Sequence, residues 1–167
     1  MNLVFTSLLF ASGFRVFKFA SSAMEPTFFA GDKFVIDELY YRHQPPHRGD
    51  LVFMRFEDVV TVKRIIAIPG DTIRGENRAV YLNGKLLVES YIQHKLRTSG
   101  ADWLDTFGPV AVPSGKYFVI GDNRDISLDS RKPEYGLLDD RSIVGEPLYG
   151  YRTVGNPPSW ELTQFGR

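Results

Sequence analysis

Residues 59–68 read Val-Val-Thr-Val-Lys-Arg-Ile-Ile-Ala-Ile and end in the turn Pro69-Gly70-Asp71. A run this rich in β-branched residues, closed by Pro-Gly, is typical of a buried strand. Period-two alternation places Lys63 on one face together with Ile65 and Ala67. Two interpretations of Lys63 stay open. It is either a lysine that snorkels from an edge strand, which the composition favours, or a desolvated amine whose lowered pKa lets it act as a base near neutral pH.

Further strand patterns lie on both sides of this run. A hairpin is predicted within residues 79–90, because two apolar runs flank Asn83-Gly84. Only one short helix is expected, near residues 139–143, and the tail from Asn156 is expected at the surface. The fold class is therefore mainly β, with many short antiparallel strands. The other strands are expected at residues 33–39, 51–56, 110–113, 116–120 and 145–151.

The composition excludes several classes of function. The chain has 167 residues, with 20 Lys and Arg against 20 Asp and Glu, which argues against a nucleic-acid binder. It has no cysteine, so disulfides, thiolate zinc sites and a cysteine nucleophile are excluded. His43 and His47 flank two prolines in a loop without a nearby carboxylate, so no metal site is expected there.

The N-terminal segment, residues 1–13, is mostly apolar. The first charges, Arg15 and Lys18, end an uncharged run of 14 residues, and a membrane span needs about 20 apolar residues. A signal peptide is not expected, because no charged region precedes the apolar run. The segment is interpreted as a core or interfacial stretch or as a shortened anchor. Residues 14–19 are either a buried strand or, with Phe28 and Phe29, an apolar surface near a membrane.

Two further stretches carry polar residues in unusual combinations. Residues 21–27 read Ser-Ser-Ala-Met-Glu-Pro-Thr, and Pro26 favours an extended Glu25 before it. This stretch is either a stiff segment that presents a side chain to a substrate or a surface turn. Residues 121–131 read Gly-Asp-Asn-Arg-Asp-Ile-Ser-Leu-Asp-Ser-Arg after a predicted strand. They are expected to form a rigid, internally hydrogen-bonded loop.

Together with Arg48-Gly49-Asp50-Leu51-Val52 and Val62-Lys63-Arg64, these stretches resemble the type I signal peptidases. That family consists of bacterial membrane-bound serine proteases with a Ser-Lys dyad, and the resemblance covers roughly residues 14–152. It implies an antiparallel β-sheet core that is coiled and barrel-like. It also implies a catalytic domain at residues 14–155, with a small β insertion at about 74–112 and a C-terminal tail at 156–167.

The resemblance assigns roles position by position. Lys63 corresponds to the general base, Ser21 to the oxyanion-hole hydroxyl that acts with the N–H of residue 23, and Ser127 to the serine that orients the lysine. Asp129 and Arg131 correspond to a structural ion pair near the site, and Asp122 is expected to pair with Arg64. Met24 and Pro26 are expected to contact substrate. No metal or cofactor is implied.

The nucleophile position departs from the family pattern, because Ala23 stands where the family has serine. Ser22 is not expected to replace it, since an extended backbone turns neighbouring side chains to opposite faces. Either a natural serine has been replaced deliberately or the chain is a naturally inactive relative. The other site residues are all present, which favours the replacement.

The implied activity is that of an endopeptidase that removes signal peptides from secreted preproteins after small residues, in the pattern Ala-x-Ala. The chain as written is expected to be inactive. The implied partners are signal peptides and a membrane surface, and the implied location is the outer face of the cytoplasmic membrane. The alternatives are an inactive relative that binds signal peptides or a membrane partner, and a self-cleaving repressor domain. The second lacks support, because no DNA-binding domain is visible.

Overall fold

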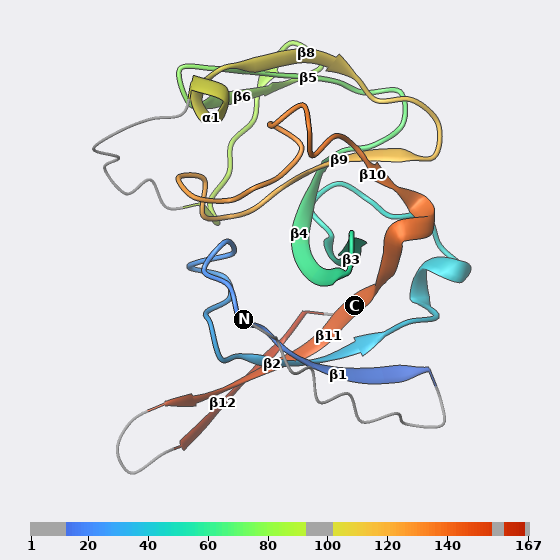
Figure 1. Ribbon diagram of the computed structural model, residues 1–167, viewed down its shortest axis with the longest axis vertical. Coiled ribbons are helices and arrows are strands. Elements are labelled where there is room, and N and C mark those ends of the chain that lie inside the picture. Colours follow the sequence, from blue (N-terminus) through green and yellow to red (C-terminus); the bar gives the residue numbers. More distant parts are fainter. Residues whose placement is uncertain (1–12, 93–101, 155–158, 166–167) are drawn as a thin grey trace.

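The computed structural model describes residues 13–92, 102–154 and 159–165, and these form two antiparallel β-sheets (Figure 1). The predicted mainly β class is therefore confirmed. The apolar segment expected at 1–13 lies outside the described residues, except for Gly13. None of the described helices is long and apolar enough to cross a lipid bilayer.

The larger sheet has the strand order β1-β2-β11-β3-β4-β9-β10, and β12 pairs with the far half of β11. Along β11, residues 143–145 pair with β3 and residues 146–151 pair with β2, with a register shift between Pro147 and Tyr149 inside the β2 pairing. Among the described strands no pairing joins β1 to β10, so the coiled core is open at its edges. The bounds are β1 (Phe14–Lys18), β2 (Lys33–Asp37), β3 (Leu51–Phe56), β4 (Val59–Ala67), β9 (Lys116–Ile120), β10 (Leu138–Asp139), β11 (Ile143–Val154) and β12 (Ser159–Gln164).

The smaller sheet has the order β7-β6-β5-β8 and lies within the stretch expected as an insertion. It packs on the larger sheet through a shared apolar cluster that includes Ile73, Val80 and Phe118. Phe107 stacks on Phe118 with ring centroids 5.3 Å apart. Its strands are β5 (Thr72–Glu76), β6 (Ala79–Leu82), β7 (Lys85–Leu86) and β8 (Phe107–Ala111).

An aromatic cluster packs against the part of the larger sheet that contains β1 and β2. Phe17, Phe28 and Phe34 are buried in it, and the Phe28 and Phe34 centroids lie 4.4 Å apart. Residues 14–18 therefore form an edge strand that buries Phe17 in this cluster, which agrees with the interpretation as a strand. Phe28 faces the core and not a membrane, whereas its neighbour Phe29 is exposed.

The C-terminal tail and the short helices differ in part from the prediction. Residues 161–164 of the C-terminal tail are exposed at the surface, as expected, but they belong to β12, which pairs with β11. Phe165 after them packs on Phe28 with ring centroids 5.0 Å apart. The short strand β12 is stabilised by its hydrogen bonds to β11, and the local sequence does not show that β11 will be its partner. Besides the expected 3-10 helix η2 (Asp140–Ser142), the chain forms η1 (Tyr40–Arg42) and α1 (Asp102–Asp105). Both are too short to leave a helical period in the sequence.

Candidate active site

The strand β4 places Lys63 in the interior of the larger sheet. β4 lies between β3 and β9, and Lys63 is 3% exposed. Its Nζ donates a hydrogen bond of 2.9 Å to Ser127 Oγ. The interpretation of Lys63 as a snorkelling lysine on an edge strand is therefore wrong. Composition favoured it because a local sequence does not show whether a later strand will pair with that edge.

Burial is the main influence on the Lys63 amine. Desolvation lowers the pKa of Lys63 from its ordinary 10.5 to about 8, against the attraction of the Asp129 carboxylate. A shift of this size corresponds to about 3 kcal/mol in favour of the neutral amine. An appreciable fraction of the amine is therefore neutral near pH 7 to 8, as a general base requires.

The loop 121–131 is internally hydrogen-bonded, as predicted. Arg131 holds the fully buried Asp129 with two bonds, Nε to Oδ1 at 2.8 Å and Nη2 to Oδ2 at 3.0 Å. The N–H of Gly121 also donates to Asp129. Burial raises the pKa of Asp129, but Arg131 and Lys63 together hold it below the ordinary value. The carboxylate therefore stays ionised beside the lysine.

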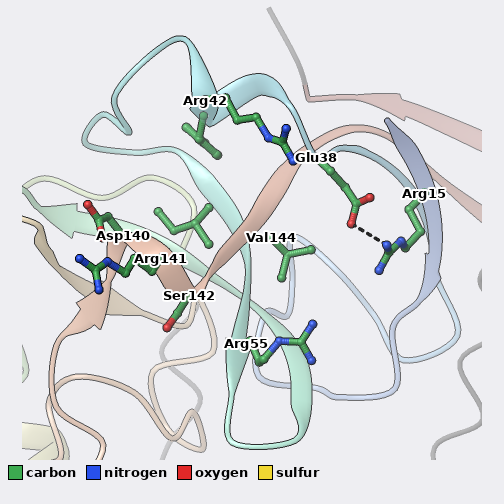
Figure 2. Close-up of a pocket in the computed structure, with 10 residues that line it drawn as sticks. Arg15, Glu38, Arg42, Arg55, Asp140, Arg141, Ser142 and Val144 are labelled. Atoms are coloured by element: carbon green, nitrogen blue, oxygen red, sulfur yellow. Dashed lines mark ion pairs between the residues drawn. The ribbon is translucent and has the colours of Figure 1, made fainter. Parts of the chain in front are cut away.

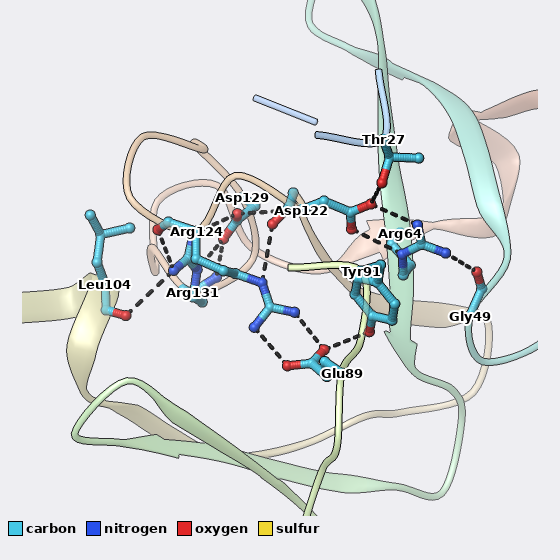
Figure 3. A network of polar contacts seen from close by, with 11 residues as sticks. Thr27, Gly49, Arg64, Glu89, Tyr91, Leu104, Asp122, Arg124, Asp129 and Arg131 are labelled. Atoms are coloured by element: carbon cyan, nitrogen blue, oxygen red, sulfur yellow. Dashed lines mark hydrogen bonds and ion pairs between the residues drawn. The ribbon is translucent and has the colours of Figure 1, made fainter. Parts of the chain in front are cut away.

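A second ion pair ties the loop to β4 (Figure 3). Arg64 donates to Asp122 from Nε at 2.9 Å and from Nη2 at 2.6 Å, and Thr27 donates its hydroxyl to the same carboxylate at 2.5 Å. The Arg64 guanidinium also lies 4.0 Å from the Tyr91 ring centroid. The expected pairing of Asp122 with Arg64 is present, and Thr27 brings a third segment distant in sequence to the same carboxylate.

The neighbouring Arg124 secures a further segment. It donates two hydrogen bonds to the Glu89 carboxylate, at 2.9 Å from Nη1 and 2.5 Å from Nη2. Both side chains are almost wholly buried. This pair fastens the chain after β7 against the loop 121–131, as Figure 3 shows.

Asn123 holds residue 23 against the same loop, and sequence reasoning did not single it out. Its N–H donates to the Ala23 carbonyl at 3.1 Å, and its Nδ2 donates to the Ser22 carbonyl at 3.0 Å. Its own carbonyl accepts the N–H of Ser127 at 3.1 Å. A Cβ atom at Gly121 would lie under 3.0 Å from both the Ala23 carbonyl and Ser127 Oγ. The turn at residue 23 therefore lies beside the Lys63–Ser127 pair.

Ser21 has a different partner from the one expected. Its Oγ accepts the N–H of Ala23 at 3.1 Å. The two groups assigned to the oxyanion hole thus bond to each other in this state. A rotation of the Ser21 side chain would free the N–H of residue 23 for another acceptor, while the Ser21 hydroxyl keeps its own O–H to donate.

Residues 21–27 do not have the extended backbone that was assumed for them. The segment is a turn, with hydrogen bonds from Glu25 N–H to Ser22 O and from Phe28 N–H to Met24 O. In a turn, neighbouring side chains do not alternate between opposite faces, so Ser22 cannot be set aside on that ground. Met24 is 0% exposed and belongs to the aromatic core, so its side chain supports the turn and does not meet a peptide in this state. Pro26 is half-buried.

The described residues contain no group of three or more His, Cys, Asp or Glu side chains that could hold a metal ion. His43 and His47 lie exposed in the loop before β3. The polar groups at this site are the Lys63 amine, the hydroxyl of Ser127 and carboxylates that are already paired with arginines. This arrangement is suited to proton transfer.

A comparison with protein families agrees with this site. The family described as signal peptidase, peptidase S26, matches residues 1–149. The chain belongs to this family. Its members, the type I signal peptidases, are membrane-anchored serine endopeptidases that cleave signal peptides and have an extracellular catalytic domain. This membership leaves the repressor interpretation without support.

Individual signal peptidases are similar over most of the chain. Signal peptidase I V of Bacillus subtilis (strain 168) is 35% identical over 137 residues, which cover 77% of this chain and 80% of that protein. A probable signal peptidase I-2 of Synechocystis is 38% identical over 162 residues, 89% of this chain and 70% of that one. The crystal structure of a signal peptidase I from Enterococcus faecalis V583 has a TM-score of 0.52 and 28% identity, and covers 62% of this chain and 97% of that one.

Proposed function

We propose that this chain is a signal peptidase domain that binds signal peptides ending in an Ala-x-Ala pattern and is inactive because Ala23 occupies the nucleophile position. The supporting observation is the buried Lys63–Ser127 pair beside the turn that carries residue 23. The site has a base, a group that orients it and candidate oxyanion donors. It lacks only an oxygen at residue 23.

With serine at position 23, the chemistry follows from this arrangement. The neutral Lys63 amine takes the proton of the serine hydroxyl as its oxygen attacks the scissile carbonyl carbon. The residue 23 N–H and the Ser21 hydroxyl donate to the developing oxyanion. The resulting ammonium then protonates the leaving amine, the peptide bond breaks and an ester to residue 23 remains. Lys63 next takes a proton from water, whose oxygen attacks the ester carbon. The ester C–O bond breaks, the ammonium returns its proton to the serine oxygen, and the peptide leaves with a new carboxyl group.

The alternative is a naturally inactive relative that binds signal peptides or a membrane partner. Ala23 itself favours this alternative, since it is the only departure in the site. The buried Lys63 amine argues against this alternative. The lowered pKa means that its charged form is about 3 kcal/mol less favourable, relative to the neutral form, than that of an exposed lysine. An inactive protein gains stability if it replaces such a lysine by an apolar residue. We therefore retain the disabled enzyme as the proposal.

The test is the Ala23→Ser variant, measured beside the chain as written on an Ala-x-Ala peptide. We expect cleavage only by the variant and its loss in Ala23→Ser/Lys63→Met. A matched Ser22→Ala change in the chain as written tests the neighbouring hydroxyl. Cleavage by the unaltered chain that Ser22→Ala abolishes would contradict the assignment of residue 23. An Ala23→Ser variant that folds and binds the peptide but does not cut would favour the inactive relative.

A further inference from the structure

Away from Lys63, a second concave site gathers arginines from four separate elements. It is a hollow of about 470 Å³ between β1, β3, η1 and the junction of η2 with β11. In Figure 2 its arginines surround Val144, with Arg42, Arg55 and Arg141 on three sides. No residue of the candidate active site lines it. The four arginines are Arg15, Arg42, Arg55 and Arg141.

The hollow carries an excess of positive charge in a chain whose formal net charge is zero. Four arginines line it against two carboxylates, Glu38 and Asp140. Arg15 forms an ion pair with Glu38, with 3.2 Å between Nη2 and Oε1. Within the described parts of the chain, Arg42, Arg55 and Arg141 have no carboxylate partner, and all three are exposed. Three guanidinium groups are thus available to a ligand.

A buried donor at the edge of the hollow points to the same kind of ligand. The Nε of Arg15 is shielded from solvent and has no hydrogen-bond acceptor among the described residues. A buried donor without an acceptor costs free energy that a bound acceptor would recover. The donors that line the hollow therefore outnumber its acceptors.

We infer that this hollow binds a phosphate group. Guanidinium groups recognise phosphate through paired N–H donors in a planar fork, and several around one anion act together. Ser142 offers a hydroxyl beside them, and Ile143 and Val144 offer an apolar wall. A phosphate carried on an apolar or glycerol body fits this lining better than a planar carboxylate of an acidic peptide, which would leave the wall uncovered.

The phosphate of an anionic lipid headgroup is the source that the chain favours. Arg15 is the second residue of β1, and residues 3–11 just before that strand are mostly apolar. A hollow beside this junction lies near the headgroups if the apolar stretch enters the membrane. Free phosphate esters share the same chemistry, and the experiment separates the two sources.

Two double variants that remove equal charge test the site. Arg42→Gln/Arg141→Gln removes two guanidinium groups from the hollow. Arg74→Gln/Lys85→Gln removes two cations from the smaller sheet, the half-buried Arg74 and the exposed Lys85. Each protein is titrated with glycerol 3-phosphate and inorganic phosphate by NMR. Each is also sedimented with vesicles of phosphatidylcholine, with or without phosphatidylglycerol, at about 150 mM salt to screen diffuse attraction.

We expect the hollow variant to lose about fivefold or more in affinity for glycerol phosphate and in sedimentation with phosphatidylglycerol vesicles, and the control to lose under about twofold. Equal losses in both variants would overturn the site, because they would reflect general charge. If the hollow variant loses affinity for glycerol phosphate but sediments with phosphatidylglycerol vesicles as the unaltered protein does, the lipid headgroup is overturned as the ligand. The ligand would then be a free phosphate ester. None of these measurements requires catalysis, so a failure of the proposed activity does not affect them.

Discussion

Lys63 shows how one buried amine defines the chemistry available to this fold. An exposed lysine near its ordinary pKa of about 10.4 is almost wholly protonated at neutral pH and cannot accept a proton. Burial of the Lys63 side chain beneath the strands on either side of β4 desolvates the amine and lowers its pKa to about 8. Ser127 then fixes the side chain by accepting a hydrogen bond from its Nζ.

The lowered pKa of Lys63 predicts the pH profile of the Ala23→Ser variant. Only the neutral amine accepts the serine proton, so kcat/KM should rise with pH and level off above about 8. The measurement is peptide cleavage from pH 6 to 10, with folding monitored by circular dichroism. A profile that is flat across pH 7 to 9 would mean that another group is the base.

Asn123 is predicted to position residue 23 for attack. In the Ala23→Ser background, Asn123→Ala removes the side-chain donor to the Ser22 carbonyl, and we expect kcat to fall about tenfold, equal to about 1.4 kcal/mol, with KM nearly unchanged. The matched control is Ser130→Ala, which removes a hydrogen bond to Val119 N–H from the same loop without touching the turn. If both variants lower kcat equally, Asn123 only stabilises the loop.

At the scale of elements, β12 illustrates a strand that exists through its partner. It pairs along β11 from Tyr149 to Val154, and Phe165 after it contacts both Phe28 and Phe34. The chain end thus closes the aromatic core that supports Met24 and the turn at residue 23.

We predict that Phe165→Ala destabilises the protein by about 2 kcal/mol, less than for a fully buried ring because Phe165 is half-buried. Leu162→Ala, on the same strand and 70% exposed, is the control and should change stability by less than about 0.5 kcal/mol. Urea unfolding of both variants measures the difference. Equal effects would show that the strand and not the ring contact matters.

At the scale of the whole molecule, Asp71 links the two sheets. It lies between β4 and β5 and accepts hydrogen bonds from Arg48, from Asn83 and from the Ile68 N–H. Burial alone would raise the pKa of Asp71, but these donors lower it to about 2. The loop before β3 and the β6–β7 turn are thereby fixed to one carboxylate.

The depressed pKa predicts an acid-dependent contribution to stability. The Asp71 interactions are fully present above its unfolded pKa of about 3.8 and are lost as pH falls through about 2. We expect Asp71→Asn to lower the free energy of unfolding by about 1 kcal/mol at pH 7, since the half-exposed Arg48 is screened by solvent. The difference should vanish near pH 2. Denaturation at pH 7, 4 and 2 measures it, and a difference that persists at pH 2 would assign the effect to packing.

The sequence by itself determined the mainly β class, most strand positions and the four stretches that resemble the signal peptidases. These features are local: alternation along β4, the Asn83-Gly84 turn and the charge-rich loop 121–131 can each be recognised within about ten residues. The pairing of Asp129 with Arg131 was also predictable by resemblance, since both residues lie in one short motif.

Only the tertiary structure decided which side chains are buried and which segments meet. The burial of Lys63 depends on β9 lying beside β4, over 50 residues later, and no local pattern encodes that cover. The same holds for Met24 in the core, for β12 against β11 and for the Asn123 bonds to residues 22 and 23. Each arises from desolvation or hydrogen bonding between distant segments, and these energies exist only once the chain has folded.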